Sequence, residues 1–248
     1  MLRSIKALRE YAITATDGTV GQVADFYLDA KAWVIRYLVA DLNEGLISRQ
    51  ALISPVALGQ PDWEERVFPI RLNREQVAQS PAITLDQPLT QQDEASLHEY
   101  YQWPVYWMGE GFAPPPAVDV PPEVYSTEEA AAPPPATLPP DPHLHRIEQV
   151  IGYTLQAKDG ETGRVKDFIV NDETWAIGYM VVDLPDGLTS HRQVLLSPHW
   201  VERVSLAEAK VTIDLHRETI QNSPAYDPAE PVNQDYEAKL YDYYGRPQ

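Results

Sequence analysis

Two pairs of aspartates occupy matching places in the two halves of the chain, and they are the side chains best suited to chemistry. They are Asp25 and Asp41, and Asp167 and Asp183. Two carboxyl groups held side by side raise the pKa of one of them, and such a pair also suits a cation. The sequence leaves a structural alternative open, in which these aspartates cap turns or pair with Arg36 or Arg71.

A second candidate group is Asp141, His143 and His145. On a strand the two imidazoles would share one face, as zinc ligands can. The group follows a proline-rich segment and has no convincing further ligand nearby. We therefore predict no metal site and no bound cofactor.

Nucleophilic catalysis has no signature in this chain. Ser54 and Ser197 each precede a proline, but no histidine stands at a fixed neighbouring position. The chain has no cysteine, which excludes thiol nucleophiles, disulfides and thiolate zinc sites. Gly18 and Gly21 have the spacing of a phosphate loop, but no Lys-Ser/Thr and no helix follows, so we predict a turn. We expect no catalytic residue and no enzyme.

These residues belong to an internal duplication. The stretch from Asp17 to Asp41 returns from Asp159 to Asp183 at a constant offset (159 − 17 = 142). After one inserted residue the repeat continues, with Ser80-Pro81 matched by Ser223-Pro224. Such dense identity between two halves indicates two copies of one structural unit.

Each copy has the pattern of a small β unit. In the first copy, alternation predicts strands at 11–16, 22–28, 33–41, 51–55 and 66–72. The alternation breaks between Val23 and Phe26, and again between Val165 and Phe168, which predicts a β-bulge. Asn73, Thr90 and Asn233 have the side chains and positions of helix caps.

The strand at 33–41 is apolar on both faces and must be covered on both. We therefore predict a mainly β protein: two small β-barrels, each followed by a short helix and a carboxyl-terminal helix. The domains would be residues 1–108 and 143–248, joined by a stiff Pro/Ala/acidic linker at 109–142.

The net charge and the lengths of the apolar runs limit the kinds of partner that we expect for this chain. The formal net charge is −18, which disfavours nucleic acid and anionic lipid as direct ligands. No apolar run reaches the roughly 18–20 residues of a membrane span, and the first residues lack the apolar centre of a signal peptide. We expect a cytoplasmic protein.

The order of the repeated motifs resembles the PRC-barrel domain. The motifs are Asp-Gly-x-x-Gly-x-Val-x-Asp-Phe from Asp17, Trp-x-Ile-x-Tyr-x-Val-x-Asp from Trp33, and a later Leu-Ile-Ser-Pro ending at Pro55. This barrel is shared by the cytoplasmic part of the photosynthetic reaction centre H subunit and by the ribosome maturation factor family. The resemblance spans about 5–108 and 147–247 and implies a non-catalytic barrel that docks on a protein or an assembly.

We expect a protein-binding adaptor or scaffold made of two diverged barrels, whose copies form an intramolecular pseudo-dimer or a homo-oligomer. One alternative is a peripheral, H-subunit-like component of a photosynthetic or other membrane electron-transfer complex. Another is a cation-binding or enzymatic site built from the repeated aspartates. A structural protein without a partner is the third.

Overall fold

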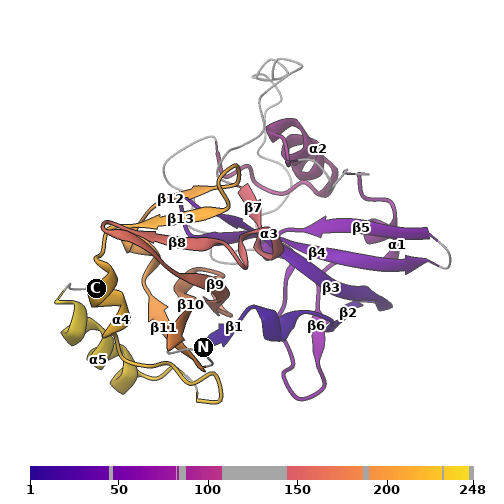
Figure 1. Ribbon diagram of the computed structural model, residues 1–248. Helices are drawn as coiled ribbons and strands as arrows, with labels where there is room; N and C mark the ends of the chain where they lie inside the picture. The colour runs from indigo at the N-terminus through magenta and orange to yellow at the C-terminus, as the bar shows by residue number, and fades with distance from the viewer. Residues whose placement is uncertain are drawn as a thin grey trace, which may run out of the picture. The chain divides into compact units, whose positions relative to one another are not determined.

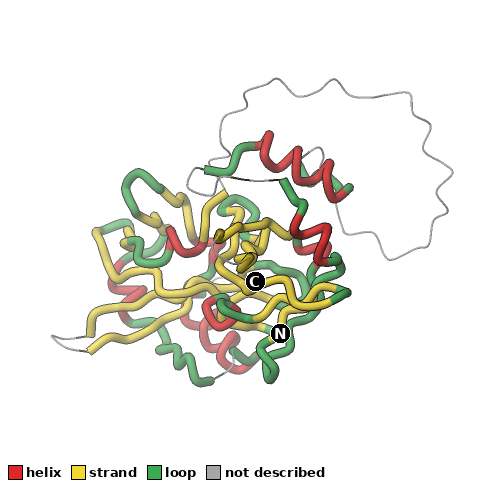
Figure 2. Tube along the Cα trace, turned by 90° about the vertical axis from the view of Figure 1, so that its right-hand side faces the viewer, coloured by secondary structure: helices red, strands yellow, loops and turns green. Residues whose placement is uncertain are grey.

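A computed structural model describes residues 1–44, 47–81, 83, 88–107, 144–186, 190–230 and 232–245. The chain divides into two compact units: Met1–Ala82 with Pro142–Gln248, and Ile83–Asp141. Both repeats contribute to the first unit, which is mainly β (Figures 1 and 2). The predicted linker at 109–142 lies outside the described residues, and the domain boundaries at 108 and 143 stay predictions.

The first repeat forms a six-stranded sheet in the order β5-β4-β3-β2-β6, with β7 paired to β3. Its strands are β2 (Ala12–Ala15), β3 (Gly18–Asp29), β4 (Val34–Glu44), β5 (Ile47–Ile53), β6 (Val67–Pro69) and β7 (Leu144–Arg146). The short helical segments are η1 (Lys6–Leu8), η2 (Pro55–Ala57) and α1 (Arg74–Ala78).

The second repeat forms a seven-stranded sheet in the order β11-β10-β9-β8-β13-β12, with β1 paired to β9. Its strands are β1 (Leu2–Ser4), β8 (Thr154–Ala157), β9 (Gly160–Asn171), β10 (Ile177–Asp186), β11 (Ser190–Leu196), β12 (Val201–Ser205) and β13 (Lys210–Ile213). Its helical segments are α3 (Ile147–Val150), η3 (Pro198–Trp200), α4 (Arg217–Gln221) and α5 (Gln234–Tyr244).

The mainly β class is confirmed, but neither sheet closes into a barrel within the described residues. β11 and β12 remain the two ends of one path, and β5 and β6 the ends of the other. In the second repeat the outer edge of β11 is already used: Val194 bridges Ala225, and the Tyr226 amide donates to the Gln193 carbonyl over 2.8 Å. β12 therefore does not meet β11 there.

The local predictions on turns, bulges and caps are confirmed. The β3–β4 ladder shifts register between Val23 and Asp25, and the β9–β10 ladder shifts at the equivalent place, between the pairs Val182–Val165 and Val181–Asp167. Asn73 makes a capping box with Gln76 at the start of α1, and Asn233 accepts the Tyr236 amide at the start of α5. One extra residue per strand thus turns Phe26 and Phe168 into the core, where both are buried.

The two repeats exchange their first strands. β1, from the start of the chain, pairs with β9 of the second repeat, and β7, from the start of the second repeat, pairs with β3 of the first. The pairing is reciprocal at the repeat offset: Leu2 lies opposite Asn171, and Leu144 lies opposite Asp29. Each sheet is therefore completed by a strand from the other repeat.

The tryptophans of the repeated hairpin lie where the two copies meet. Trp33 and Trp175 both have positive φ, 52° and 61°, at the end of a turn whose first residue accepts the tryptophan amide. The Ile35 amide donates to the Trp175 carbonyl, and the Ile177 amide donates to the Trp33 carbonyl, each over 2.8 Å. These mirrored bonds flank the bridge between Val34 and Ala176 and mark a pseudo-twofold axis.

Aromatic rings fill the same junction. Phe26 lies 6.3 Å from Trp175, and Phe168 lies 6.4 Å from Trp33, between ring centroids. Phe68 adds a second ring to Trp175 at 5.6 Å. Because Phe26, Phe168 and Trp175 are all buried, the junction is a continuous core and not a surface contact between two finished barrels.

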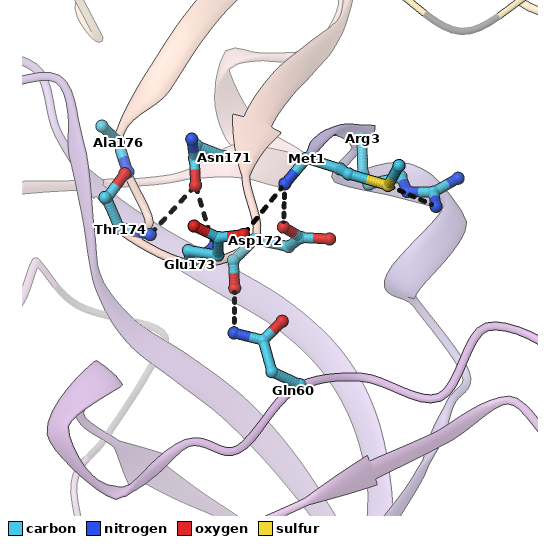
Figure 3. A network of polar contacts seen from close by, with 8 residues as sticks. All are labelled: Met1, Arg3, Gln60, Asn171, Asp172, Glu173, Thr174 and Ala176. Carbon is cyan, nitrogen blue, oxygen red and sulfur yellow. Dashed lines mark hydrogen bonds and ion pairs between the residues drawn. The ribbon is translucent and has the colours of Figure 1, made fainter.

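Polar contacts close the rim of this junction (Figure 3). The amino group of Met1 bonds the Asp172 carboxylate, and the Gln60 side chain donates to the Asp172 carbonyl over 3.2 Å. Asn171 shapes the turn by accepting the Glu173 and Thr174 amides. Residues of the first repeat thus hold the hairpin tip of the second.

α5 covers one face of the second sheet. Leu240 packs in a buried cluster with Ile169, Tyr179, Val181 and Leu195. The Tyr179 hydroxyl donates to Glu237 on the same helix over 2.8 Å. Figure 1 shows α4 and α5 beside β11, which agrees with these contacts. The carboxyl-terminal helix predicted for this repeat is present and packs on its sheet.

The second unit contributes one helix, α2 (Gln91–Tyr101), to the described residues. Thr90 and Asp93 form the predicted capping box. The His98 ring lies within about 6 Å of Trp103, Tyr106 and Trp107, and Tyr106 donates to Glu94. The aromatic residues Trp103, Tyr106 and Trp107, which follow α2, therefore pack onto this helix.

Candidate functional site

Asp25 is a structural anchor. It is fully buried at the β3 bulge and pairs with Arg146 of β7, whose Nε lies 3.0 Å from Oδ2. The Glu148 amide also donates to this carboxylate. Burial raises the pKa of Asp25, while the Phe26 amide and Arg146 act against that rise. The partner of Asp25 is thus Arg146 of the other repeat, and not Arg36 or Arg71.

Asp167 has the same role with other partners. It accepts hydrogen bonds from the Ser4 hydroxyl and from the amides of Lys6 and Phe168. Burial raises the pKa of this carboxyl group too, against the lowering effect of those hydrogen bonds. Both aspartates therefore hold the segment that crosses over from the other repeat.

The repeated aspartates do not form carboxylate pairs across their ladders. Asp25 lies opposite Val39 on β4, whereas Asp41 lies opposite Gln22. In the second repeat Asp167 lies opposite Val181, and Asp183 opposite Arg164. The described residues hold no group of three His, Cys, Asp or Glu side chains that could bind a metal ion.

The structure describes most of the other residues that the sequence singled out as candidates. Ser54 and Ser197 are buried residues that begin η2 and η3, and the Ser197 hydroxyl accepts the His199 amide. His145 is buried in β7, opposite Leu28. Asp141 and His143 lie outside the described residues. Arg36 pairs with Asp29, with Nη2 2.7 Å from Oδ2.

A cavity on the first repeat was not predicted from the sequence. It has a volume of about 680 Å³ and lies between β2, the start of β3 and α1. Its apolar lining includes Leu42 and Val77, both buried. Gly21 contributes bare backbone, because a Cβ there would lie 2.1 Å from the Asp41 carbonyl oxygen. The cavity thus has an apolar floor formed by closely packed strands.

Charged side chains line the cavity unevenly. Glu10, Asp17 and Glu75 provide three carboxylates, and Arg74 provides one guanidinium. Asp17 accepts the Arg74 amide over 2.8 Å, and Asn73 accepts the Gln76 amide. These side chains take up two of the amide donors at the start of α1. With three carboxylates and one guanidinium in its lining, the cavity presents net negative charge.

Glu10 is the unusual residue of this lining. Its φ is 67°, in the left-handed region that costs a residue with a side chain roughly 1 kcal/mol. The equivalent residue of the second repeat is Gly152, whose φ is 93° and where an added Cβ would meet nothing within 4 Å. Within the described part of the chain the Glu10 carboxylate has no hydrogen bond or ion pair. The first repeat thus accepts backbone strain to keep a free carboxylate at the cavity.

The same place on the second repeat is crossed by charged side chains. Arg164, which replaces Gln22, donates from Nη1 to the Gly152 carbonyl over 3.1 Å. Glu161, which replaces Thr19, pairs with Lys210 at 2.7 Å. Three matching positions thus line a cavity in one repeat and are tied to internal polar contacts in the other. A smaller cavity of about 430 Å³ remains on the second repeat, and its lining includes Asp159, Glu218 and Tyr243.

The sequence did contain a signal for this site. The duplication aligns Glu10 with Gly152 and Gln22 with Arg164, and a glutamate aligned with a turn glycine marks a position where a side chain is kept at a conformational cost. Residues shared by the two repeats do not point to this site, because a site present in one copy shows itself only as a difference between the copies.

The comparison with models of protein families and the search of curated proteins returned no match. In the parts of the chain that the structure describes, no helix combines the length and the apolar character needed to cross a membrane.

Proposed function

We propose that this protein is a non-catalytic adaptor, built from two diverged PRC-type units, that binds protein partners through unlike surfaces of its two repeats. The observation that carries the proposal is the divergence at equivalent positions of one body. The first repeat has Glu10, Thr19 and Gln22 beside a cavity of about 680 Å³, whereas the second has internal polar contacts at these positions and a smaller cavity with a different lining. Duplication followed by divergence of exposed positions suits two-site binding, since linking two weak sites raises apparent affinity by roughly 10²–10⁴.

The two repeats share one strand arrangement, which supports two copies of one unit. In each, four consecutive antiparallel strands are followed by a strand that pairs in parallel with the first: β6 with β2, and β13, after β12, with β8. Two such units that share a pseudo-twofold axis would derive from a homodimer of single-domain ancestors. We propose the cytoplasm as the location of this protein.

The experiment should leave both repeats intact, because each sheet contains a strand from the other and a deletion would damage both. We would place a photoreactive residue at Glu65 or at Glu208, which are exposed and equivalent. Cross-linking in the source cell, followed by peptide identification, should give reproducible protein partners with a different pattern for the two positions. Absence of cross-links from both positions, and from two further exposed positions on each repeat, would contradict the proposal.

A further inference from the structure

We propose that the cavity between β2, β3 and α1 binds a basic side chain, arginine or lysine, presented by an extended segment of a protein partner. This inference rests on the proposed function, because it names the chemistry of the partner. It starts from the cavity itself, whose volume of about 680 Å³ can hold a long side chain together with its backbone.

The lining matches both parts of such a side chain. Ala12, Val20 and Ala78, all half-buried, offer an apolar surface for the methylene stem of a basic residue, whose charged end stays toward water. Glu10, Asp17 and Glu75 outnumber the single Arg74, so the rim carries a net charge of −2. An anionic ligand would face these carboxylates, and it would find the Arg74 and Gln76 amides of α1 already bonded.

The equivalent surface of the second repeat carries basic side chains of its own. Arg164 donates to the Gly152 carbonyl, and Lys210 pairs with Glu161. The first repeat has Gln22 and Val67 at these two positions, and Thr19 in place of Glu161, so neither contact forms there. A basic group from a partner would instead meet the carboxylates of Glu10, Asp17 and Glu75.

Glu10 gives the inference its sharpest test, because its carboxylate is free while its backbone is strained. Glu10→Gly installs the residue of the second repeat, so it should raise the melting temperature and still abolish binding. Glu10→Gln keeps the strain and removes the charge, so it should leave the melting temperature unchanged and weaken binding. A gain in stability together with a loss of binding is the usual trade-off at a functional site.

The probe is an acetylated, amidated pentapeptide with a central arginine among alanines, and its control has citrulline in place of arginine. Binding to the full chain would be followed by amide chemical shifts at low ionic strength, where exposed charges are least screened. We expect the arginine peptide to shift residues of β2, β3 and α1, and Glu10→Gln to weaken it roughly tenfold, the ratio that one charge-assisted hydrogen bond supplies. Glu218→Gln, the equivalent of a Glu75 change on the second repeat, should leave binding unchanged.

Equal binding of the arginine and citrulline peptides would overturn the inference, as would shifts that map equally to both repeats or a Glu10→Gln protein that binds like the unchanged chain. These failures are separable from failure of the proposed function. Cross-linked partners without arginine binding would agree with the adaptor function and contradict the proposed site. Glu10-dependent arginine binding without cross-linked partners would agree with the proposed site and contradict the adaptor function.

Discussion

Replacing Arg146 by methionine should destabilise the whole protein. The substitution keeps most of the apolar stem and removes the guanidinium that pairs with Asp25, which is fully buried. Removing one member of a buried ion pair costs about 3–5 kcal/mol, because the remaining charge stays desolvated. Arg146 is partly exposed, so we expect the lower end, about 3 kcal/mol. Its second contact, with exposed Glu148 at 3.7 Å, should contribute little.

The loss should depend on pH in a defined direction. Burial already raises the pKa of Asp25, and Arg146 is one of the groups that opposes the rise. Without Arg146, the pKa of Asp25 in the folded protein rises further above its unfolded value. A carboxyl group with a raised folded pKa stabilises the fold below the unfolded pKa and loses that contribution as pH rises through the folded pKa. The penalty of Arg146→Met should therefore be full at pH 7 and shrink toward about pH 4.

Urea-induced unfolding, followed by tryptophan fluorescence at several pH values, measures both effects. The matched control is Ser4→Ala at the equivalent position, which removes one hydrogen bond to Asp167 and should cost about 1.5 kcal/mol. The reasoning fails if Arg146→Met costs no more than Ser4→Ala at pH 7, or if its penalty is the same at pH 5 as at pH 7.

Three further results are expected. Asp167→Asn keeps two hydrogen bonds at Oδ1, from the Lys6 and Phe168 amides, and its Nδ2 would donate to the Ser4 hydroxyl where Oδ2 now accepts from it. The free energy of unfolding at pH 7 should therefore stay within about 0.5 kcal/mol of that of the unchanged protein or exceed it. Any gain should disappear as pH falls, because only the unchanged carboxyl group has the raised pKa, and a large loss at pH 7 would contradict this. Gly163→Ala should lower the melting temperature far more than Gly152→Ala, because both have positive φ but only at Gly163 would a Cβ lie 2.6 Å from the Leu184 side chain; equal effects would be against the packing described here. Trp175→Ala should cost about 3–5 kcal/mol, and calorimetry should still give one transition with equal calorimetric and van't Hoff enthalpies; two separate transitions would mean that the repeats unfold independently.

The sequence predicted what neighbouring residues decide. Asn73 predicts the start of α1, where it forms a capping box with Gln76, and the broken alternation at Val23 and Phe26 predicts the bulge. Both features depend on a few adjacent side chains. The exchange of β1 and β7 was not predicted. Each is three residues long, too short for a periodic pattern, and its partner lies more than a hundred residues away.

Contacts between residues far apart in the sequence also decide the role of the repeated aspartates. Their repetition was visible, and it suggested a paired carboxylate site. Their role depends on Arg146 and Ser4, which approach only through the strand exchange. The cavity had to be found in the structure for a related reason, since its lining combines β2, β3 and α1, and its most informative residue, Glu10, is replaced by Gly152 in the second repeat.

The exchanged strands also bear on how the nascent chain matures at the ribosome. Ser4 pairs with Ile169, so β1 must wait until 165 more residues (169 − 4) have been synthesised before its partner exists. At roughly 5–20 residues per second this interval is about 8–33 s, and the first sheet lacks β7 for most of it. A protein built this way reaches its final form late, in a step that needs β1 and β9 together, and release of the chain before residue 144 would leave β1 and the β7 edge of β3 unpaired for chaperones to protect.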